Sequence, residues 1–289
     1  MRILYVQPAV SPSKGGAQWN TAHLALGMAQ RGHKIGLVGG FSSLPTLLPQ
    51  LRQANISVVD HHIHERGAQS LPGLMWHIRK FNPDVIHSYL RSADIVASIA
   101  SIPFRAMSVS TVGEHLPTYH DVANPSPYKS KLHRWSLSKR MSAVVATSAF
   151  VKNSLLKYAE IGNHRIHTIP NGIDTQVFCP SRRENPSSLF GIPLDGKLVI
   201  GVIGRISIEK RPSMLLDIVS RMNAKGLDVV GLFIGDGSQR SEIEELVERN
   251  RQNNVIKFVG IRDDMDRVYR ALDLVVHFCD VEGFGLTHA

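Results

Sequence analysis

Several features that mark particular protein classes are scarce or missing in this chain of 289 residues. It has only two cysteines, Cys179 and Cys279, which are too few for a disulfide scaffold and fit a reducing compartment. No apolar run approaches the roughly 20 residues that a membrane-spanning helix needs. Met1 and Arg2 lead directly into an apolar stretch that is too short for the core of a signal peptide. We therefore expect a folded, cytoplasmic protein.

Aromatic residues are also few, at 7% of the chain, although the net charge is +9. A basic chain can bind nucleic acid, an anionic membrane surface or a phosphorylated small molecule. Proteins that bind single strands interleave aromatic and basic residues, and this chain has no such platform, so nucleic acid is not an expected partner. The dinucleotide-binding pattern Gly-x-Gly-x-x-Gly is absent between Pro8 and Gly16, which argues against a dehydrogenase.

The basic residues gather most closely at 129–134 and 139–140, within a predicted helix over 128–140. Two interpretations remain open for this cluster. It can be an ordinary solvated helix face, or it can make a peripheral contact with anionic lipid at the inner face of a membrane.

The chain is rich in alternating apolar runs and helical segments. Short apolar runs and helical segments follow one another along the whole chain, which predicts the α/β class with parallel βαβ units. The last apolar run, 272–278, predicts a final buried strand. Between 177 and 197 the sequence becomes polar and is broken by prolines. We therefore expect two Rossmann-like domains, 1–175 and 197–289, joined by a linker over 176–196 and facing a cleft.

A carboxylate and two glycines follow the last predicted strand, in the stretch Glu282-Gly283-Phe284-Gly285. Open α/β sheets bind ligands at the carboxyl ends of their strands. Glycines let main-chain amides approach a phosphate or sugar closely, and a carboxylate can accept hydrogen bonds from sugar hydroxyls. Taken alone, the stretch is equally well interpreted as a surface glutamate before an ordinary loop.

Two cations, Arg205 and Lys210, lie where another predicted strand ends and a helix begins. Arginine offers a forked contact and lysine a compact charge, a combination that suits a diphosphate. The alternative is a pair of exposed surface cations. Near the N-terminus, Gly15-Gly16 precedes a helix, an arrangement that can cradle a phosphate but that ordinary turns also use.

Together these motifs resemble the retaining glycosyltransferases of the GT-B fold, of the family-4 (glycosyl transferases group 1) type. In order, the set is Gly15-Gly16, His115, Pro170-Asn171-Gly172, Gly204-Arg205 with Lys210, Gly235-Asp236-Gly237 and Glu282-Gly283-Phe284-Gly285. The resemblance covers essentially the whole chain. It implies transfer of a hexose, with retention of configuration and without a metal or other cofactor, from a UDP- or GDP-linked sugar. The acceptor would be a hydroxyl of a glycan, a lipid-linked molecule or a small molecule.

The same resemblance implies roles for individual residues. Arg205 and Lys210 would neutralise the charge on the leaving nucleoside diphosphate, and Glu282 would hold hydroxyls of the donor sugar. His115 would orient the sugar rather than act as a base, its alternative being a loop histidine with a purely structural role. Further contacts with the donor are expected from Gly15, Gly16, Asn171, Gly204, Gly235, Gly237, Ile261, Phe284, Gly285 and Leu286.

One departure from the family pattern stands at the end of the chain. The pattern places a second glutamate where the residue after Ala289 would be, so the resemblance implies an incomplete second domain with weakened donor binding or no activity. Two other functions stay open. One is a sugar-nucleotide epimerase of the same fold, which the Glu282 motif and the Gly204-Arg205 spacing disfavour. The other is a non-catalytic module that binds a nucleotide sugar or a polyanion.

Overall fold

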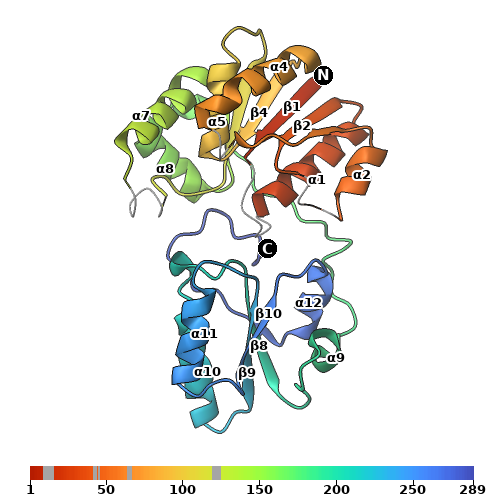
Figure 1. Cartoon of the computed structure of the whole chain (residues 1–289), viewed down its shortest axis with the longest axis vertical. Coiled ribbons are helices and arrows are strands. Elements are labelled where there is room, and N and C mark those ends of the chain that lie inside the picture. The colour runs from red at the N-terminus through yellow and green to blue at the C-terminus, as the bar shows by residue number, and fades with distance from the viewer. Residues whose placement is uncertain (9–15, 42–43, 45, 64–66, 119–124) are drawn as a thin grey trace. The chain divides into compact units, whose positions relative to one another are not determined.

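The computed structural model describes residues 1–8, 16–41, 44, 46–63, 67–118 and 125–289. Its residues form two compact units. The first comprises Met1–Gly172 together with Glu282–Leu286, and the second comprises Ile173–Val281 together with Thr287–Ala289. Each unit is built around its own parallel sheet, as the ribbon shows (Figure 1).

The first unit contains a seven-stranded sheet in the order β3-β2-β1-β4-β5-β6-β7. Its strands are β1 (Arg2–Gln7), β2 (Lys34–Gly39), β3 (Ser57–Val59), β4 (Val85–Tyr89), β5 (Met107–Val112), β6 (Ala143–Ala146) and β7 (Ile166–Thr168). All paired strands run parallel, so their carboxyl ends meet at one edge. That edge is where the loops with the predicted site residues begin.

Helices cover both faces of this sheet (Figure 1). They are α1 (Gly16–Gln30), α2 (Leu48–Gln53), α4 (Leu71–Phe81), α5 (Arg91–Ala100), α7 (Pro127–Trp135) and α8 (Ala149–Ala159), with short turns η1 (Gly67–Ser70), η2 (Ser136–Arg140) and η3 (Asn163–Arg165). Strand β1 shows why two layers form. Ile3 and Tyr5 pack in the cluster that includes α1 and α2, whereas Leu4 and Val6 pack in the cluster that includes α4 and α5.

The second unit contains a four-stranded sheet in the order β10-β9-β8-β11. Its elements are α9 (Pro186–Phe190), β8 (Leu198–Ile203), η4 (Ile208–Lys210), α10 (Ser213–Ala224), β9 (Val229–Ile234), α11 (Arg240–Arg249), β10 (Ile256–Gly260), α12 (Met265–Ala271) and β11 (Leu274–Val275). Helices α10 and α11 lie on one face, and α9 and α12 on the other (Figure 1). Both strands at the centre, β8 and β9, are almost entirely buried.

The predicted α/β class with two Rossmann-like parallel sheets is confirmed by these units. Two details of the prediction are wrong. The strand expected over 272–278 is only Leu274–Val275, since just these two residues pair with β8 at the edge of the sheet. The helix expected over 128–140 changes to a π-helical turn at Ser136–Arg140. Helix α9 lies inside the range 176–196 that the sequence indicates as a linker.

The basic cluster of the sequence falls on α7 and η2, and the structure divides it. Lys129, Lys131, Arg134 and Lys139 are exposed, whereas His133 is buried and its Nε2 lies 3.1 Å from a carboxylate oxygen of Asp94. Within the described residues, no helix combines the length and apolar character needed to cross a membrane. A peripheral contact of the exposed lysines and arginine with anionic lipid stays a prediction.

In each sheet a glycine at the end of the second strand in the chain lies against the end of the first: Gly39 is the last residue of β2, and Gly235 directly follows β9. Gly39 has a φ of +143°, and a Cβ atom there would lie 1.7 Å from the carbonyl oxygen of Gln7. Gly235 has a φ of +144°, and its Cβ would lie 2.0 Å from the carbonyl oxygen of Gly204. Both the backbone angle and the lack of space require glycine. The predicted site residue Gly235 therefore has to be glycine for reasons of backbone conformation and space alone.

A histidine in the first sheet predicts how stability depends on pH. Burial lowers the pKa of His87 to about 4, and its Nε2 lies 2.7 Å from the hydroxyl oxygen of Thr111. The unfolded chain, with a histidine pKa near 6.5, therefore binds the proton more readily, so stability is fully present above pH 6.5 and falls toward pH 4. At pH 5 the loss is about 2 kcal/mol, or roughly 5 °C in Tm. The Tm of His87→Gln should depend less on pH than the Tm of the parent. His164→Gln, a variant at an exposed histidine, should keep the pH dependence of the parent. An equal pH dependence of the Tm in all three proteins would show that His87 is not the titrating group.

Candidate functional site

The carboxyl edge of the first sheet holds several of the predicted residues. Gly16 begins α1, which follows β1 in the chain, and His115 follows β5. Asn171 follows β7 by three residues. By its contacts the segment Glu282–Leu286 also belongs to the first unit. These residues are far apart in the sequence, and the parallel sheet brings their loops to one edge.

Gly283 is fixed at this edge by the loop after β5 and by the start of α8. Ser148 caps α8 by accepting a hydrogen bond from the Val151 amide at 3.2 Å, and its hydroxyl donates to the Gly283 carbonyl at 2.5 Å. A Cβ atom on Gly283 would lie 1.8 Å from the carbonyl oxygen of Gly113. Position 283 thus requires glycine, because its backbone lies against that of Gly113. This contact also fixes where the preceding residue, Glu282, lies in the first unit.

His115 is half-buried and lies against an aromatic ring. Phe150, in the first turn of α8, stacks on its imidazole with the ring centroids 4.8 Å apart and the planes at 28°. Phe150 keeps 48% of its surface exposed. The stacking holds the imidazole of His115 beside the capped start of α8, so its orientation is set by packing as well as by its own loop.

Asn171 is held by two partners from the first unit. Asn20 on α1 donates from Nδ2 to Oδ1 of Asn171 at 2.8 Å. The hydroxyl of Tyr89, at the end of β4, also hydrogen-bonds with Asn171. Burial, with the nearby charge of Glu114, raises the pKa of Tyr89 well above its usual range, so this hydroxyl keeps its proton. Asn171 therefore joins α1 to β4 at the edge of the sheet.

In the second unit, the turns after β8 and β9 are hydrogen-bonded to each other. The Gly204 amide donates to the Ile234 carbonyl at 2.9 Å, and the Ile206 amide donates to the Asp236 carbonyl at 3.1 Å. Gly237 follows in the second of these turns. The predicted residues Gly204, Gly235 and Gly237 thus belong to one hydrogen-bonded pair of turns, and Ile261 is exposed on the loop that follows β10.

Of the two predicted cations, Arg205 lies in the turn after β8, and Lys210 is the last residue of the short turn η4 (Ile208–Lys210). Arg205 is exposed and makes a loose ion pair with Glu209, with 3.8 Å between Nη2 and Oε1. Lys210 is less exposed, and its ammonium lies 3.4 Å from Nε2 of His277. An exposed ion pair at such a distance contributes little to stability. Both cations therefore lie near the carboxyl end of β8, at the edge of the second sheet.

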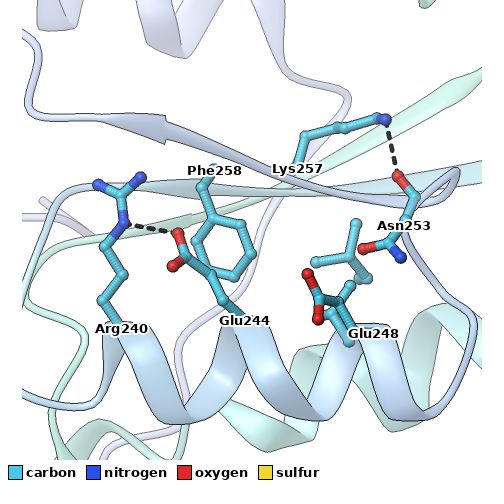
Figure 2. A pocket seen from close by; sticks show the side chains of 8 residues that line it. Arg240, Glu244, Glu248, Asn253, Lys257 and Phe258 are labelled. Atoms are coloured by element: carbon cyan, nitrogen blue, oxygen red, sulfur yellow. Dashed lines mark hydrogen bonds and ion pairs between the residues drawn. The ribbon is translucent and has the colours of Figure 1, made fainter.

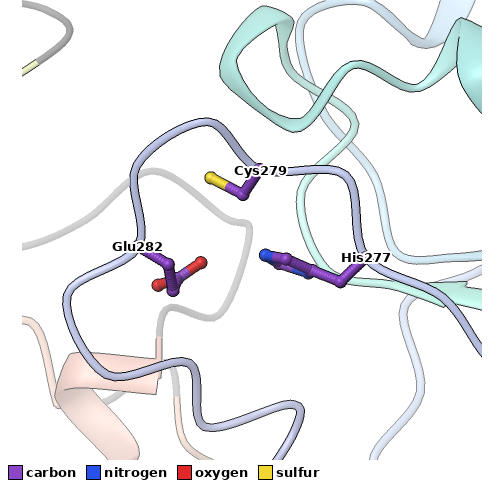
Figure 3. Close-up of side chains that lie close together, drawn as sticks. All are labelled: His277, Cys279 and Glu282. Atoms are coloured by element: carbon purple, nitrogen blue, oxygen red, sulfur yellow. The ribbon is translucent and has the colours of Figure 1, made fainter.

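The loop after β11 is tied to the same turn by a second pair. The Arg211 guanidinium contacts both carboxylate oxygens of Asp280, at 2.5 Å and 2.7 Å. The loop carries His277 and Cys279 and then reaches Glu282, as Figure 3 shows. The dipeptide Lys210-Arg211 thus contacts this loop at two points within the second unit.

The sequence contains an Asp-x-Asp triplet, Asp264-Met265-Asp266, a pattern that binds metals in some sugar-transferring enzymes. Here it lies at the start of α12, and both carboxylates face arginines. Asp264 accepts two hydrogen bonds from Arg262, at 2.6 Å and 2.8 Å, which lower its pKa. Asp266 accepts one from Arg270 at 2.8 Å. The triplet is therefore engaged in ion pairs on the helix.

A surface hollow of about 400 Å³ lies between α11 and β10, away from these loops (Figure 2). Arg240 bonds to Glu244 at 2.8 Å on one side of it, and Lys257 donates to the Asn253 carbonyl at 2.7 Å on the other. Phe258 forms its floor and stacks on Phe233. None of the predicted site residues lines this hollow.

The structure therefore gathers the predicted residues in two groups, one in each unit. The first unit holds Gly16, His115, Asn171, Glu282, Phe284, Gly285 and Leu286, and the second holds Arg205, Lys210, Gly204, Gly235, Gly237 and Ile261. Gly15 lies outside the described residues. Sequence reasoning missed the roles of Phe150, Arg211 and Asp280. The opposite charges of Arg211 and Asp280 are compatible with an ion pair, but no local sequence pattern around either residue indicates that they meet.

Comparison with known proteins identifies the family of this chain and the fold that it shares. The model of Glycosyltransferase Family 4 matches residues 14–177, and that of Glycosyl transferases group 1 matches residues 189–289. In the solved structure of HepE from Anabaena in complex with UDP-glucose, the fold matches 96% of this chain and 73% of that one, with a TM-score of 0.78 at 23% identity.

Two curated relatives illustrate the similarity in sequence. The 2-deoxystreptamine glucosyltransferase of Streptomyces kanamyceticus is 25% identical over 197 residues, which is 65% of this chain and 49% of the relative. The lipopolysaccharide core biosynthesis mannosyltransferase LpsB of Rhizobium meliloti is 28% identical over 265 residues, which is 89% of this chain and 65% of the relative. The chain thus spans from about half to about two thirds of these relatives' length. Since the first family model covers more than half of its residues, the chain belongs to glycosyltransferase family 4.

Proposed function

We propose that this protein transfers a hexosyl group from a UDP- or GDP-linked sugar to an acceptor hydroxyl, with retention of configuration and without a metal ion. One observation carries the proposal. In a chain of this family, Lys210 and Arg205 stand beside the hydrogen-bonded turns at the carboxyl edge of the second sheet. Two cations beside glycine-rich turns suit a diphosphate better than any other common ligand.

In the proposed reaction, the bond between the anomeric carbon and the diphosphate oxygen breaks, and the acceptor oxygen bonds to the same face of that carbon. The acceptor hydroxyl gives its proton to the departing phosphate oxygen. Lys210 and Arg205 neutralise the negative charge that develops on this oxygen, which replaces the role of a divalent cation. Glu282 holds hydroxyls of the donor sugar, and His115, positioned by Phe150, orients the sugar.

The similar proteins support a nucleotide sugar as donor, since one matching structure contains UDP-glucose and a curated relative is a GDP-mannose-dependent mannosyltransferase. A glycan, a lipid-linked molecule or a small molecule would serve as acceptor. Contacts with the donor are assigned to the predicted glycines and to Asn171, Ile261, Phe284 and Leu286, and to Gly15 by sequence alone.

A melting panel with UDP, GDP, ADP and NAD tests this function. We expect one nucleoside diphosphate, at about 100 times its Kd, to stabilise the protein by roughly 2.7 kcal/mol, which raises the Tm by about 5 °C or more. The shift should persist in EDTA, and NMR of the product should show the donor's anomeric configuration. A preference for NAD, or indifference to every diphosphate, would exclude the proposal. Diphosphate binding without transfer to any sugar acceptor would instead favour a non-catalytic binding module.

A further inference from the structure

Lys210, the proposed diphosphate contact, lies beside the imidazole of His277. Its ammonium lies 3.4 Å from Nε2 of His277, on the loop after β11. The adjacent Arg211 holds that loop through its two bonds to Asp280, three residues beyond His277. The imidazole is therefore kept beside the ammonium by a separate ion pair and does not depend on the lysine alone.

The chemistry of this contact assigns a role to each of its two groups. A lysine ammonium can only donate hydrogen bonds, so in this contact Nε2 of His277 is the acceptor, as in the ring tautomer that carries its proton on Nδ1. His288 packs edge-on against the same ring, with centroids 4.2 Å apart. Within the part of the chain that the structure describes, the titratable and charged groups near the ring include Lys210, His288 and, on its own loop, Cys279 and Glu282 (Figure 3).

We propose that His277 is a second, proton-dependent contact for the donor's diphosphate. This inference rests on the proposed function, because it needs a diphosphate at Lys210. Without donor, the ammonium disfavours a second positive charge on the neighbouring ring, and the Glu282 carboxylate, within 4.8 Å of a ring nitrogen, offsets part of that effect. When a diphosphate binds, its two negative charges outweigh that repulsion, and Nε2 takes a proton from the solvent. The ring then changes from an acceptor for Lys210 to a donor for a phosphate oxygen.

The consequence is that donor binding takes up a proton. Isothermal titration calorimetry with UDP-glucose and GDP-mannose measures this uptake when it is run at pH 7 in buffers of different ionisation enthalpy, with EDTA present. Both phosphates of these donors are esterified and do not titrate near neutrality, so any proton taken up belongs to the protein. We expect an uptake of about half a proton, and an affinity that rises by roughly 3- to 10-fold as the pH falls from 8 to 6.

Three variants assign the proton. His277→Gln should bind without uptake and with a flat pH profile. His288→Gln and His167→Gln, the second at an exposed histidine of the first unit, should retain the uptake. Equal uptake in the parent and in His277→Gln would overturn the inference, and loss of uptake in His288→Gln alone would move the proton to that residue.

The same titrations separate this inference from the proposed function. Donor binding that releases heat but involves no proton would leave the proposed function standing and remove only the role of His277. The absence of any binding of UDP-glucose and GDP-mannose, together with no effect of nucleoside diphosphates on melting, would remove both.

Discussion

Replacing Lys210 with alanine should slow sugar transfer by about 10²- to 10³-fold while weakening donor binding far less. The reason is that negative charge grows on the leaving diphosphate only as the glycosidic bond breaks. An ammonium beside that oxygen therefore stabilises the transition state more than the bound donor. Steady-state rates and calorimetric affinities for the same donor measure the two effects separately.

A matched control and a companion variant sharpen this result. Lys225→Ala removes an exposed lysine at the end of α10, in the same unit, and should leave both rate and affinity unchanged. Arg205→Ala should cost less than Lys210→Ala, because the Arg205 side chain is more exposed and already contacts Glu209. A loss of affinity equal to the loss of rate would show that Lys210 only binds the donor, against the proposed role in the transition state.

The largest effect on stability is expected from Asp94→Ala. Asp94 is 1% exposed and accepts from the Ser88 hydroxyl at 2.5 Å, and its other oxygen lies 3.1 Å from Nε2 of His133, which is also 1% exposed. Removing the carboxylate takes a buried partner from His133 and leaves the Ser88 hydroxyl with only a long contact, 3.4 Å, to the Val109 carbonyl. This should destabilise the first unit by about 3 kcal/mol and lower its Tm by roughly 10 °C.

Melting curves followed by circular dichroism measure this change. Asp94→Asn keeps an acceptor for Ser88 and should lose clearly less than alanine does. Asp217→Ala, at an exposed aspartate of α10, should melt with the parent. An unchanged Tm for Asp94→Ala would mean that the buried pair contributes no net stability, as occurs where desolvation cancels attraction.

The sequence predicts this fold because its signals are local. Apolar runs of strand length, separated by helical segments, predict parallel units, and glycines or charges directly after a run fall at the carboxyl edge of a sheet. The same rule puts Gly204, Arg205 and Gly235 at one edge, where the turns after β8 and β9 are indeed hydrogen-bonded to each other. A serine directly before a helical segment is a typical cap, and Ser148 does accept from the Val151 amide.

What the sequence does not predict depends on contacts between distant segments. Nothing around Gly283 indicates that its carbonyl meets the hydroxyl of Ser148, 135 positions earlier. The contact of His277 with Lys210 likewise joins residues 67 positions apart. The strand predicted over 272–278 is too long for the same reason, since the length of a strand is set by its pairing with a distant segment, and only Leu274 and Val275 pair with β8.

The two glycines that close β2 and β9 also limit how these sheets can be re-engineered. The carbonyls of Gln7 and Gly204 leave no room for a side chain at Gly39 and Gly235. A loop grafted after β2 or β9 therefore has to begin after Gly39 or Gly235. A graft that begins before this residue would replace the glycine with a residue whose side chain does not fit. Loops can be exchanged beyond these two residues while the sheets keep their own ends.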